Sequence, residues 1–190
     1  MDKYYDSIVS GYSELYGIEQ LKKMEIIKDY IDKEIKLLNN YEQLLIDIGC
    51  GTGLSTSMIE VPCVGLDPSM DSLNSANQTR LEKTGVTNFQ FEPTITESIN
   101  HLGYICGIAE ALPFKTDCCK ISISITAVHN FSDIEMGLKE IKRITSHRAV
   151  ITVLKKAKRY SDIILLIKKY FQIHEIVDSE VDSIFYLIPR

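Results

Sequence analysis

The sequence has no tryptophan, only five prolines and no low-complexity tract among its 190 residues. Its longest uninterrupted apolar run, 163–167, is far shorter than the roughly 20 residues that a membrane-spanning helix needs. Neither sustained heptads nor a collagen-like glycine period is present, so coiled coil and collagen are excluded. The composition, 45% hydrophobic and 25% charged with a net charge of −5, is typical of a folded globular domain.

Targeting and metal-binding patterns are also missing. The N-terminus lacks the cationic start and the apolar stretch of a secretory signal. The five cysteines are odd in number and form no CxxC pair, which argues against a disulfide framework and against a zinc site. We therefore expect a cytoplasmic protein with reduced thiols, no metal site and no membrane association.

The hydrophobic pattern alternates between helices and strands along the chain. Apolar residues at steps of three and four predict an amphipathic helix over 18–38. Short apolar or alternating runs predict strands over 44–48, 63–66, 104–108, 120–125, 149–154, 171–177 and 183–188. Further helices are predicted from residue 54 and over 69–83, 132–144 and 161–170.

This order of elements predicts an α/β fold. Strands that alternate with helices form a mostly parallel sheet with helices on both faces, and the last two strands would add an antiparallel hairpin. No repeat or linker divides the chain, so we expect one domain over 1–190, with an N-terminal segment and helix over 1–40. The segment 84–101 exceeds what one helix and one loop require. It is either an insertion near the mouth of the active site or a surface excursion without function.

A glycine-rich loop, DIGCGTG over 47–53, lies between a predicted strand and a predicted helix. Glycines let the backbone turn tightly and approach a ligand more closely than a Cβ would allow. Asp67 closes the next strand, where an acid can accept hydrogen bonds from both hydroxyls of a ribose. Together these features predict a nucleoside-containing ligand at the carboxyl ends of the strands.

The spacing of the glycines distinguishes between two such ligands. The dinucleotide fingerprint is GxGxxG, whereas this loop has Gly49, Gly51 and Gly53, with Asp47 two residues ahead. An acid is unfavourable beside a pyrophosphate but attracts a ligand that carries an ammonium and a sulfonium group. S-adenosylmethionine is thus favoured over NAD. A capping role for Asp47 and an NAD-dependent oxidoreductase are the alternatives.

Three segments resemble the class I S-adenosylmethionine-dependent methyltransferases, in particular the small type with an AEALPF motif. They are DIGCGTG over 47–53, VGLDPS over 64–69 and AEALPF over 109–114, and the resemblance extends from about 44 to about 154. It implies a Rossmann-like, seven-stranded sheet with an antiparallel last strand, methyltransferase activity and S-adenosylmethionine as the cofactor. The cofactor-binding residues that it implies are Asp47, Gly49, Cys50, Gly51, Gly53, Asp67, Pro68, Ala109, Glu110 and Leu112.

The chain departs from the family pattern at several positions. Ile108 stands where family members usually carry an Asp that accepts a hydrogen bond from the adenine amino group. Glu110 or a backbone carbonyl would then replace that acceptor. Cys119-Lys120 stands in place of a Phe-Asp pair, and 145–148 in place of a Lys-Pro-Gly-Gly turn. The sequence therefore indicates a divergent member.

Methyl transfer from a sulfonium mainly requires proximity, alignment and exclusion of water, and a base only where the nucleophile must lose a proton. His129 and Asn130, which follow the fourth strand, are the candidate catalytic residues. Structural roles, a histidine bonded to backbone and an asparagine that caps the next helix, are the alternatives. In similar enzymes an N-terminal segment closes over the cofactor, and Tyr5 and Tyr12 would belong to such a lid unless they only pack against the sheet.

Basic residues are concentrated in the segment 139–169, which carries a net charge of +8 and leaves −13 for the rest of the chain. Its run KKAKR over 155–159 follows the fifth strand, where it could steer RNA or another polyanion, or simply be a solvated surface. The leading hypothesis is an S-adenosylmethionine-dependent methyltransferase with a small-molecule acceptor. The alternatives are an RNA methyltransferase, for instance of a tRNA base, and a catalytically silent partner subunit that binds the cofactor.

Overall fold

The computed structural model describes residues 14–38, 44–84 and 101–190. The chain divides into two compact units, Met1–Tyr41 and Glu42–Arg190. The described part of the first unit is one helix, α2 (Glu14–Leu38), which begins earlier than the predicted helix over 18–38 and ends at the same residue. The assignment of both units to a single domain stays a prediction. Tyr5, Tyr12 and almost all of 84–101 lie outside the described residues.

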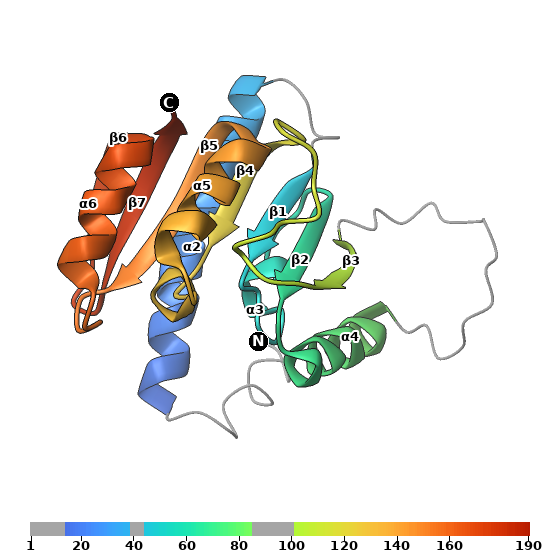
Figure 1. Ribbon diagram of the computed structural model, residues 1–190. Coiled ribbons are helices and arrows are strands. Elements are labelled where there is room, and N and C mark those ends of the chain that lie inside the picture. Colours follow the sequence, from blue (N-terminus) through green and yellow to red (C-terminus); the bar gives the residue numbers. More distant parts are fainter. Residues whose placement is uncertain (1–13, 39–43, 85–100) are drawn as a thin grey trace. The chain divides into compact units, whose positions relative to one another are not determined.

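The second unit contains one seven-stranded sheet, which confirms the α/β fold (Figure 1). The strand order is β3-β2-β1-β4-β5-β7-β6. The strands are β1 (Leu45–Ile48), β2 (Cys63–Asp67), β3 (His101–Cys106), β4 (Cys119–Ser124), β5 (Thr145–Leu154), β6 (Phe171–Asp178) and β7 (Asp182–Pro189). The helices between them are α3 (Leu54–Ser57), α4 (Met70–Thr84), the 3-10 helix η1 (Val128–Asn130), α5 (Ile134–Ile144) and α6 (Tyr160–Tyr170).

The topology places a switch point of the strand order at the end of β1. This strand pairs in parallel with β2 on one side and with β4 on the other, and β5 continues the parallel set. The chain first moves outward from β1 to β3 and then returns to β4, so the strand order reverses beside β1. In open α/β sheets ligands bind outside the carboxyl ends of the strands at such a switch point. β7 is antiparallel to both β5 and β6, which confirms the predicted hairpin.

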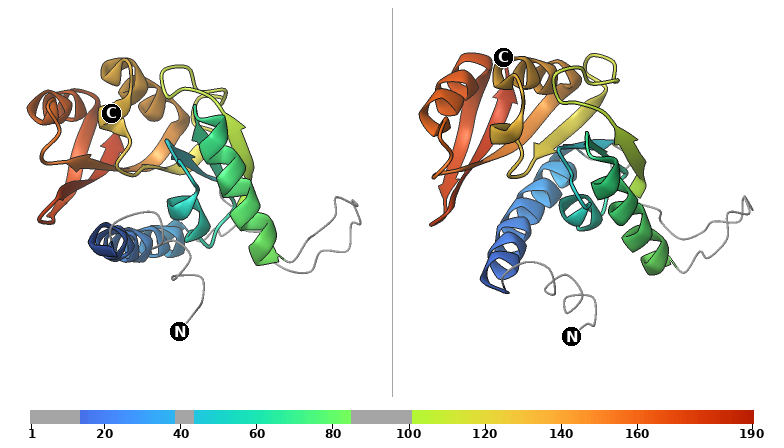
Figure 2. Two further views of the ribbon diagram at one scale, coloured as in Figure 1. Left: turned by 90° about the horizontal axis from the view of Figure 1, so that it is seen from below. Right: turned by 60° about the horizontal axis from the view of Figure 1, so that its bottom comes forward.

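The alternation of side chains along β1 shows that helices cover both faces of the sheet. Ile46 and Ile48 belong to a core cluster with Leu138 of α5 and Ile163 of α6. Asp47 points to the opposite side, where its carboxylate accepts hydrogen bonds from α3. Figure 2 shows α5 and α6 on one face and α3 on the other. None of the described helices combines the length and the apolar character needed to cross a bilayer.

The first residues of β3 differ from the prediction. The strand covers His101–Cys106, whereas the sequence predicts it over 104–108. His101 pairs with Cys63 in the β2 ladder, so pairing with the neighbouring strand determines the start of β3.

The start of β5 also differs, because α5 ends directly in the strand. β5 begins at Thr145 and not at Ala149. The Thr145 hydroxyl donates to the Ile141 carbonyl at 2.6 Å and lies 2.6 Å from the Ser122 hydroxyl of β4. One side chain thus closes the helix and fixes the new strand to its neighbour, so no separate turn is needed where the family has its Lys-Pro-Gly-Gly segment.

Candidate cofactor site

The loop after β1 holds three glycines in the left-handed region, with φ of +76° at Gly49, +55° at Gly51 and +78° at Gly53. L-residues adopt this backbone conformation only at a cost. A Cβ on Gly49 would overlap the side chain of Ala127, and a Cβ on Gly53 would overlap that of Tyr104. A Cβ on Gly51 would meet nothing within 4 Å. Packing therefore requires glycine at 49 and 53, whereas Gly51 borders open space.

Asp67, the last residue of β2, forms one hydrogen-bonded unit with this loop. Its Oδ2 accepts from the Gly51 amide and its Oδ1 from the Ser69 amide, each at 2.9 Å. The Gly49 amide donates to the Leu66 carbonyl at 2.7 Å. A carboxylate can accept about four hydrogen bonds. Asp67 therefore has acceptor capacity left for the hydroxyls of a ribose.

Asp47 lies beneath the loop and is fully buried. Its Oδ2 accepts hydrogen bonds from the hydroxyls of Ser55 at 2.6 Å and Thr56 at 2.7 Å, so it ties α3 to β1. Its Oδ1 has no hydrogen-bond partner among the described residues. Burial, opposed by the two hydroxyls, raises the pKa of Asp47 to about 6. At neutral pH this carboxylate is mainly ionised and places a negative charge under the loop.

The segment 109–114 is attached to α5 by an ion pair that the sequence analysis missed. Arg143 donates to the carbonyls of Phe114 at 2.7 Å and Leu112 at 3.1 Å. It also pairs with Glu140 at 2.7 Å, and Glu140 accepts from the Leu112 amide at 2.9 Å. The Arg143 guanidinium holds the pKa of Glu140 below its usual range. The sequence did contain a signal for this ion pair, because Glu140 and Arg143 are opposite charges three residues apart on a predicted helix.

Glu110, the acid nearest in sequence to Ile108, is tied to the start of α5. One carboxylate oxygen of Glu110 accepts from the amide of Asp133, the N-cap of α5, at 3.0 Å. Ile108 is 50% exposed and follows Gly107, whose amide donates to the Asp67 carbonyl at 3.2 Å. An exposed apolar residue therefore directly follows the residue whose amide is bonded to Asp67. The roles of Pro68, which is exposed, and of the buried Ala109 and Leu112 stay predictions.

The chain turns sharply after β4, beside β1. Thr126 has a φ of +57°, and its amide donates to the Thr152 hydroxyl of β5 at 2.7 Å. The Ser124 hydroxyl donates to the Ile48 carbonyl at 2.9 Å. These bonds fasten the end of β4 to both neighbouring strands, so the following residues stay next to the glycine loop.

The candidate catalytic residues follow this turn. Ala127 packs against Gly49, and η1 begins at the next residue. His129 is partly buried and Asn130 is exposed, both at the same edge of the sheet as the loop. The helix cap that was the alternative role of Asn130 is provided by Asp133, which accepts from the Met136 amide at 3.0 Å. Participation of His129 and Asn130 in catalysis stays a prediction.

Phe131 and Gly137 are structural residues of the site that the sequence analysis did not single out. A Cβ on Gly137 would lie 2.5 Å from the Phe131 ring, and one on Gly49 would lie 3.9 Å from it. The ring therefore packs between the glycine loop and α5. A lone glycine within a helical pattern often marks a close approach of this kind, and Gly137 was such a signal.

Cys50, in the centre of the loop, is buried and has a free thiol. Burial raises its pKa well above the ordinary value, so the thiol stays protonated at neutral pH. Its sulfur would lie 2.8 Å from a Cβ on Gly65, the residue of β2 that pairs with Asp47. Cys50 therefore contributes packing beneath the loop and no nucleophile.

The basic run 155–159 lies in the turn between β5 and α6, at the carboxyl end of β5. Lys155 is engaged: its Nζ donates to the Ser179 carbonyl at 2.7 Å and lies 3.2 Å from Asp178. The β6–β7 turn beside it also carries Glu180, which is exposed. Acidic residues outside 139–169 therefore offset part of the positive charge that the sequence places at this edge.

A parallel sheet with a left-handed glycine loop at its switch point, and an acid at the end of the next strand, defines an α/β domain that binds a nucleoside cofactor. Residues 46–153 match the methyltransferase domain family, and the chain belongs to this family. It is a class I S-adenosylmethionine-dependent methyltransferase domain.

The chain is 31% identical over 106 residues to the uncharacterized methyltransferase YcgJ of Bacillus subtilis (strain 168). The match covers 54% of this chain and 36% of that protein, so it spans about a third of the relative's length. The structure of magnesium protoporphyrin IX methyltransferase (ChlM) from Synechocystis PCC 6803 was solved with bound SAM. It has a TM-score of 0.71 and 14% sequence identity, and the match covers 100% of this chain and 92% of the ChlM chain. A SAM-dependent methyltransferase from Aquifex aeolicus has a TM-score of 0.60 and 15% sequence identity. That match covers 87% of this chain and 96% of the Aquifex chain. These structures share the fold.

Proposed function

We propose that the protein transfers a methyl group from S-adenosylmethionine to a small-molecule acceptor. The observation that carries this proposal is the unit of the loop 49–53 and Asp67, in which Gly51 borders open space and Asp67 keeps acceptor capacity. The Synechocystis protein with the same fold, solved with bound SAM, supports the choice of cofactor. A cytoplasmic location stays part of the proposal.

The residues present fit this cofactor. Asp67 would accept hydrogen bonds from the ribose hydroxyls, and the backbone of 49–53 would border the methionine part. The negative charge of Asp47 beneath the loop favours an ammonium and a sulfonium above it. Ile108 and the segment 109–112 would contact the adenine with apolar atoms. When bound, S-adenosylmethionine supplies a methyl group attached to a good leaving group. The acceptor would attack the methyl group in line with the bond to that leaving group.

The chain's own part in the reaction is then mostly positioning. His129, at the carboxyl end of β4, would accept a proton where the acceptor must lose one, and Asn130 would orient the acceptor. Tyr5 and Tyr12 would close over the site and exclude water, as the resemblance implies. Because the sulfonium already activates the methyl group, alignment contributes more than acid–base chemistry does.

An RNA acceptor is the second candidate, because Lys156, Lys158 and Arg159 are exposed and form no ion pair with another described residue. Replacing all three by alanine should abolish methylation of RNA and leave a small neutral acceptor largely unaffected. Lys155 is the matched control, since it is bound to the β6–β7 turn. The third candidate, a silent partner subunit, rests on the missing acid at Ile108.

Incubation of the protein with methyl-labelled S-adenosylmethionine and a fractionated cell extract separates these candidates. We expect label in the small-molecule fraction. Label confined to RNA would replace the proposed acceptor by the second candidate. Binding of S-adenosylhomocysteine without transfer in any fraction, followed by transfer once a co-purifying protein is added, would favour the partner subunit.

Asp47 gives cofactor binding an expected pH dependence. Its pKa is raised from 3.8 to about 6, so the ionised form that attracts the ligand's ammonium group is lost as the pH falls through that value. We expect the Kd of S-adenosylhomocysteine to rise roughly tenfold between pH 7 and pH 5, following the ionised fraction of one carboxylate. Calorimetric titration at several pH values measures this, and the Asp47→Asn variant should bind weakly with little pH dependence.

The same pKa shift has the opposite sign for stability. Because the folded state binds the Asp47 proton more tightly than the unfolded chain, this residue lowers stability as the pH rises from about 4 to about 6. The Asp47→Asn variant should lack that loss of stability, which urea unfolding at several pH values measures.

For ligand binding, identical pH profiles of the wild type and the Asp47→Asn variant would contradict the role assigned to Asp47.

A further inference from the structure

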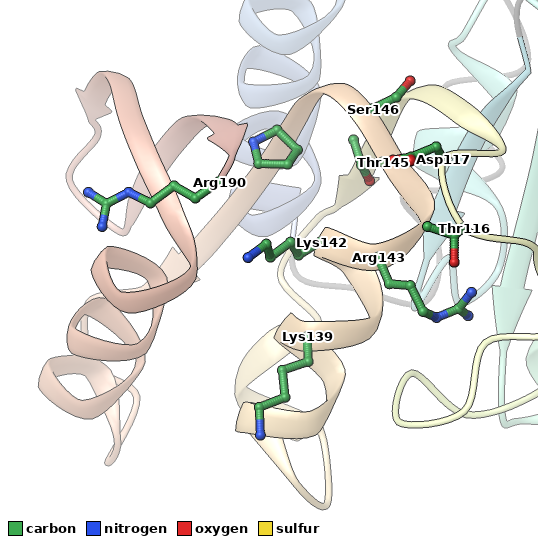
Figure 3. A pocket seen from close by; sticks show the side chains of 9 residues that line it. Thr116, Asp117, Lys139, Lys142, Arg143, Thr145, Ser146 and Arg190 are labelled. Carbon is green, nitrogen blue, oxygen red and sulfur yellow. The ribbon is translucent and has the colours of Figure 1, made fainter.

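A pocket at the amino ends of β4 and β5 does not bring its charged side chains together around a ligand. Figure 3 shows Lys139, Lys142 and Arg143, all on α5, pointing away from one another. Because Ser146 near the start of β5 also lines it, this pocket lies at the opposite end of the sheet from the glycine loop. Tyr104 of β3, in contrast, packs against the loop itself.

Tyr104 belongs to a row of three residues that crosses the sheet beneath the loop. Gly65 of β2 pairs with Asp47 of β1 on one side and with Tyr104 of β3 on the other. Paired residues of neighbouring strands point to the same face of a sheet, so Tyr104 shares with Asp47 the face on which α3 lies. The middle member of the row has no side chain, which leaves space above β2.

The side chain of Tyr104 extends across β2 into this space and reaches the loop. A Cβ on Gly65 would lie 2.6 Å from Cδ1 of the Tyr104 ring and 2.8 Å from the sulfur of Cys50. A Cβ on Gly53 would overlap the Tyr104 hydroxyl and lie 2.9 Å from its ring carbon Cζ. Tyr104 therefore lies against the last glycine of the loop, and Cys50 of the loop fills the same space from above.

Gly53, which Tyr104 supports, connects the loop with α3. It is the N-cap of α3, its amide donates to the Cys50 carbonyl at 3.0 Å, and its carbonyl accepts from the Ser57 amide at 2.9 Å. A displacement of Gly53 would therefore move the loop backbone together with the helix whose hydroxyls bind Asp47.

We propose that Tyr104 is a positioning residue of the cofactor site, which acts on the ligand through Gly53 and Cys50. This inference rests on the proposed function and adds β3 to the strands that shape its site. The loop comes from the end of β1 and its acid, Asp67, from the end of β2, whereas the support beneath the loop comes from the next strand. Side chains that bind a ligand precisely need such support from the residues behind them.

Calorimetric titration of the full chain with S-adenosylhomocysteine compares the wild type with three variants at residue 104. Tyr104→Ala should raise the Kd roughly tenfold or more, because a loop displaced by a fraction of an ångström no longer fits the ligand. Tyr104→Leu fills the space above Gly65 but is too short to reach Gly53, so it should also raise the Kd while costing less stability. Tyr104→Phe keeps Cζ beside Gly53, and its Kd should stay within about threefold of the wild type.

Alkylation of Cys50 follows the position of the loop without any ligand. The Cys50 side chain is only 6% exposed and faces the space that Tyr104 fills. Labelling by iodoacetamide, measured at each cysteine by mass spectrometry, should be several-fold faster at Cys50 in Tyr104→Ala than in the wild type. Cys63, which is fully buried in β2, should react at the same rate in both proteins. Equal acceleration at the two cysteines would mean that the whole sheet has loosened, and would overturn the positioning role.

The matched control is Tyr170→Ala in α6, on the other face of the sheet (Figure 2). Tyr170 is also a partly buried tyrosine, and its hydroxyl donates to Glu135. This variant should lose stability in urea unfolding without a change in the Kd of S-adenosylhomocysteine or in the labelling of Cys50.

The outcomes separate this proposal from the proposed function. If the wild type binds S-adenosylhomocysteine, an unchanged Kd or unchanged Cys50 labelling in Tyr104→Ala, or an equal rise of the Kd in Tyr170→Ala, would overturn the role of Tyr104. If the wild type binds no S-adenosylhomocysteine while Cys50 becomes reactive only in the variants that no longer reach Gly53, the proposed function fails and the support of the loop by Tyr104 stands.

Discussion

Replacement of Gly49 by alanine is expected to lower the free energy of unfolding by about 2–5 kcal/mol. A left-handed backbone costs an L-residue about 1–2 kcal/mol, and overpacking of a close contact adds about 1–3 kcal/mol. Both effects apply, because Gly49 has a φ of +76° and its added Cβ would overlap the side chain of Ala127. The Phe131 ring would also lie 3.9 Å from that Cβ, in ordinary van der Waals contact. Urea unfolding followed by circular dichroism measures the loss.

The matched control for this substitution is Gly51→Ala in the same loop. Gly51 has a φ of +55°, but its added Cβ would meet nothing within 4 Å. Only the backbone cost of about 1–2 kcal/mol should therefore appear in stability. If the cofactor occupies that open space, binding of S-adenosylhomocysteine should weaken far more than stability does. Equal destabilisation by the two alanines would contradict the packing described for the loop.

The second large effect is expected from Arg143→Ala. This substitution removes the ion pair with Glu140 and the hydrogen bonds to the carbonyls of Leu112 and Phe114. The Arg143 side chain is 31% exposed, so water replaces part of what is lost, and we expect a destabilisation of about 1–3 kcal/mol. Because segment 109–114 loses its attachment to α5, S-adenosylhomocysteine should also bind several-fold more weakly.

Two comparisons make the Arg143 prediction specific. Arg143→Lys should restore only part of the stability, because a lysine cannot bond a carboxylate and two carbonyls in the same planar arrangement. Lys142→Ala, on the same turn of α5, should change stability by no more than about 0.5 kcal/mol, since Lys142 has no partner among the described residues. A neutral effect of Arg143→Ala in urea unfolding would show that the segment is held by other contacts.

The sheet and its hairpin were predictable because their signals are local. The apolar runs over 44–48 and 63–66 mark buried strands, and the terminal hairpin shows as two runs with no helical pattern between them. The glycines of 49–53 and the acid at Asp67 are equally local, since their spacing alone indicates the turn and the ligand. These signals required no knowledge of which distant residues meet.

The features that were missed depend on distant partners. The direct passage from α5 into β5 relies on Thr145 finding Ser122 of β4. The run 155–159 is partly neutralised by Asp178, which lies beyond α6 and becomes a neighbour only through the hairpin. Attachment of segment 109–114 requires Arg143, about thirty residues later in the chain. Such pairings are determined by tertiary packing, which composition and periodicity do not describe.

The most direct test of the central claim, that the loop 49–53 and Asp67 hold S-adenosylmethionine, is a calorimetric titration with S-adenosylhomocysteine. We expect the wild type to bind it and not NADH. Asp67→Ala should weaken binding by about 1–3 kcal/mol, or roughly 5- to 150-fold, through loss of a charged hydrogen bond. A folded wild type that gives no binding heat with S-adenosylhomocysteine, or an Asp67→Ala variant that binds it as tightly as the wild type, would contradict the account.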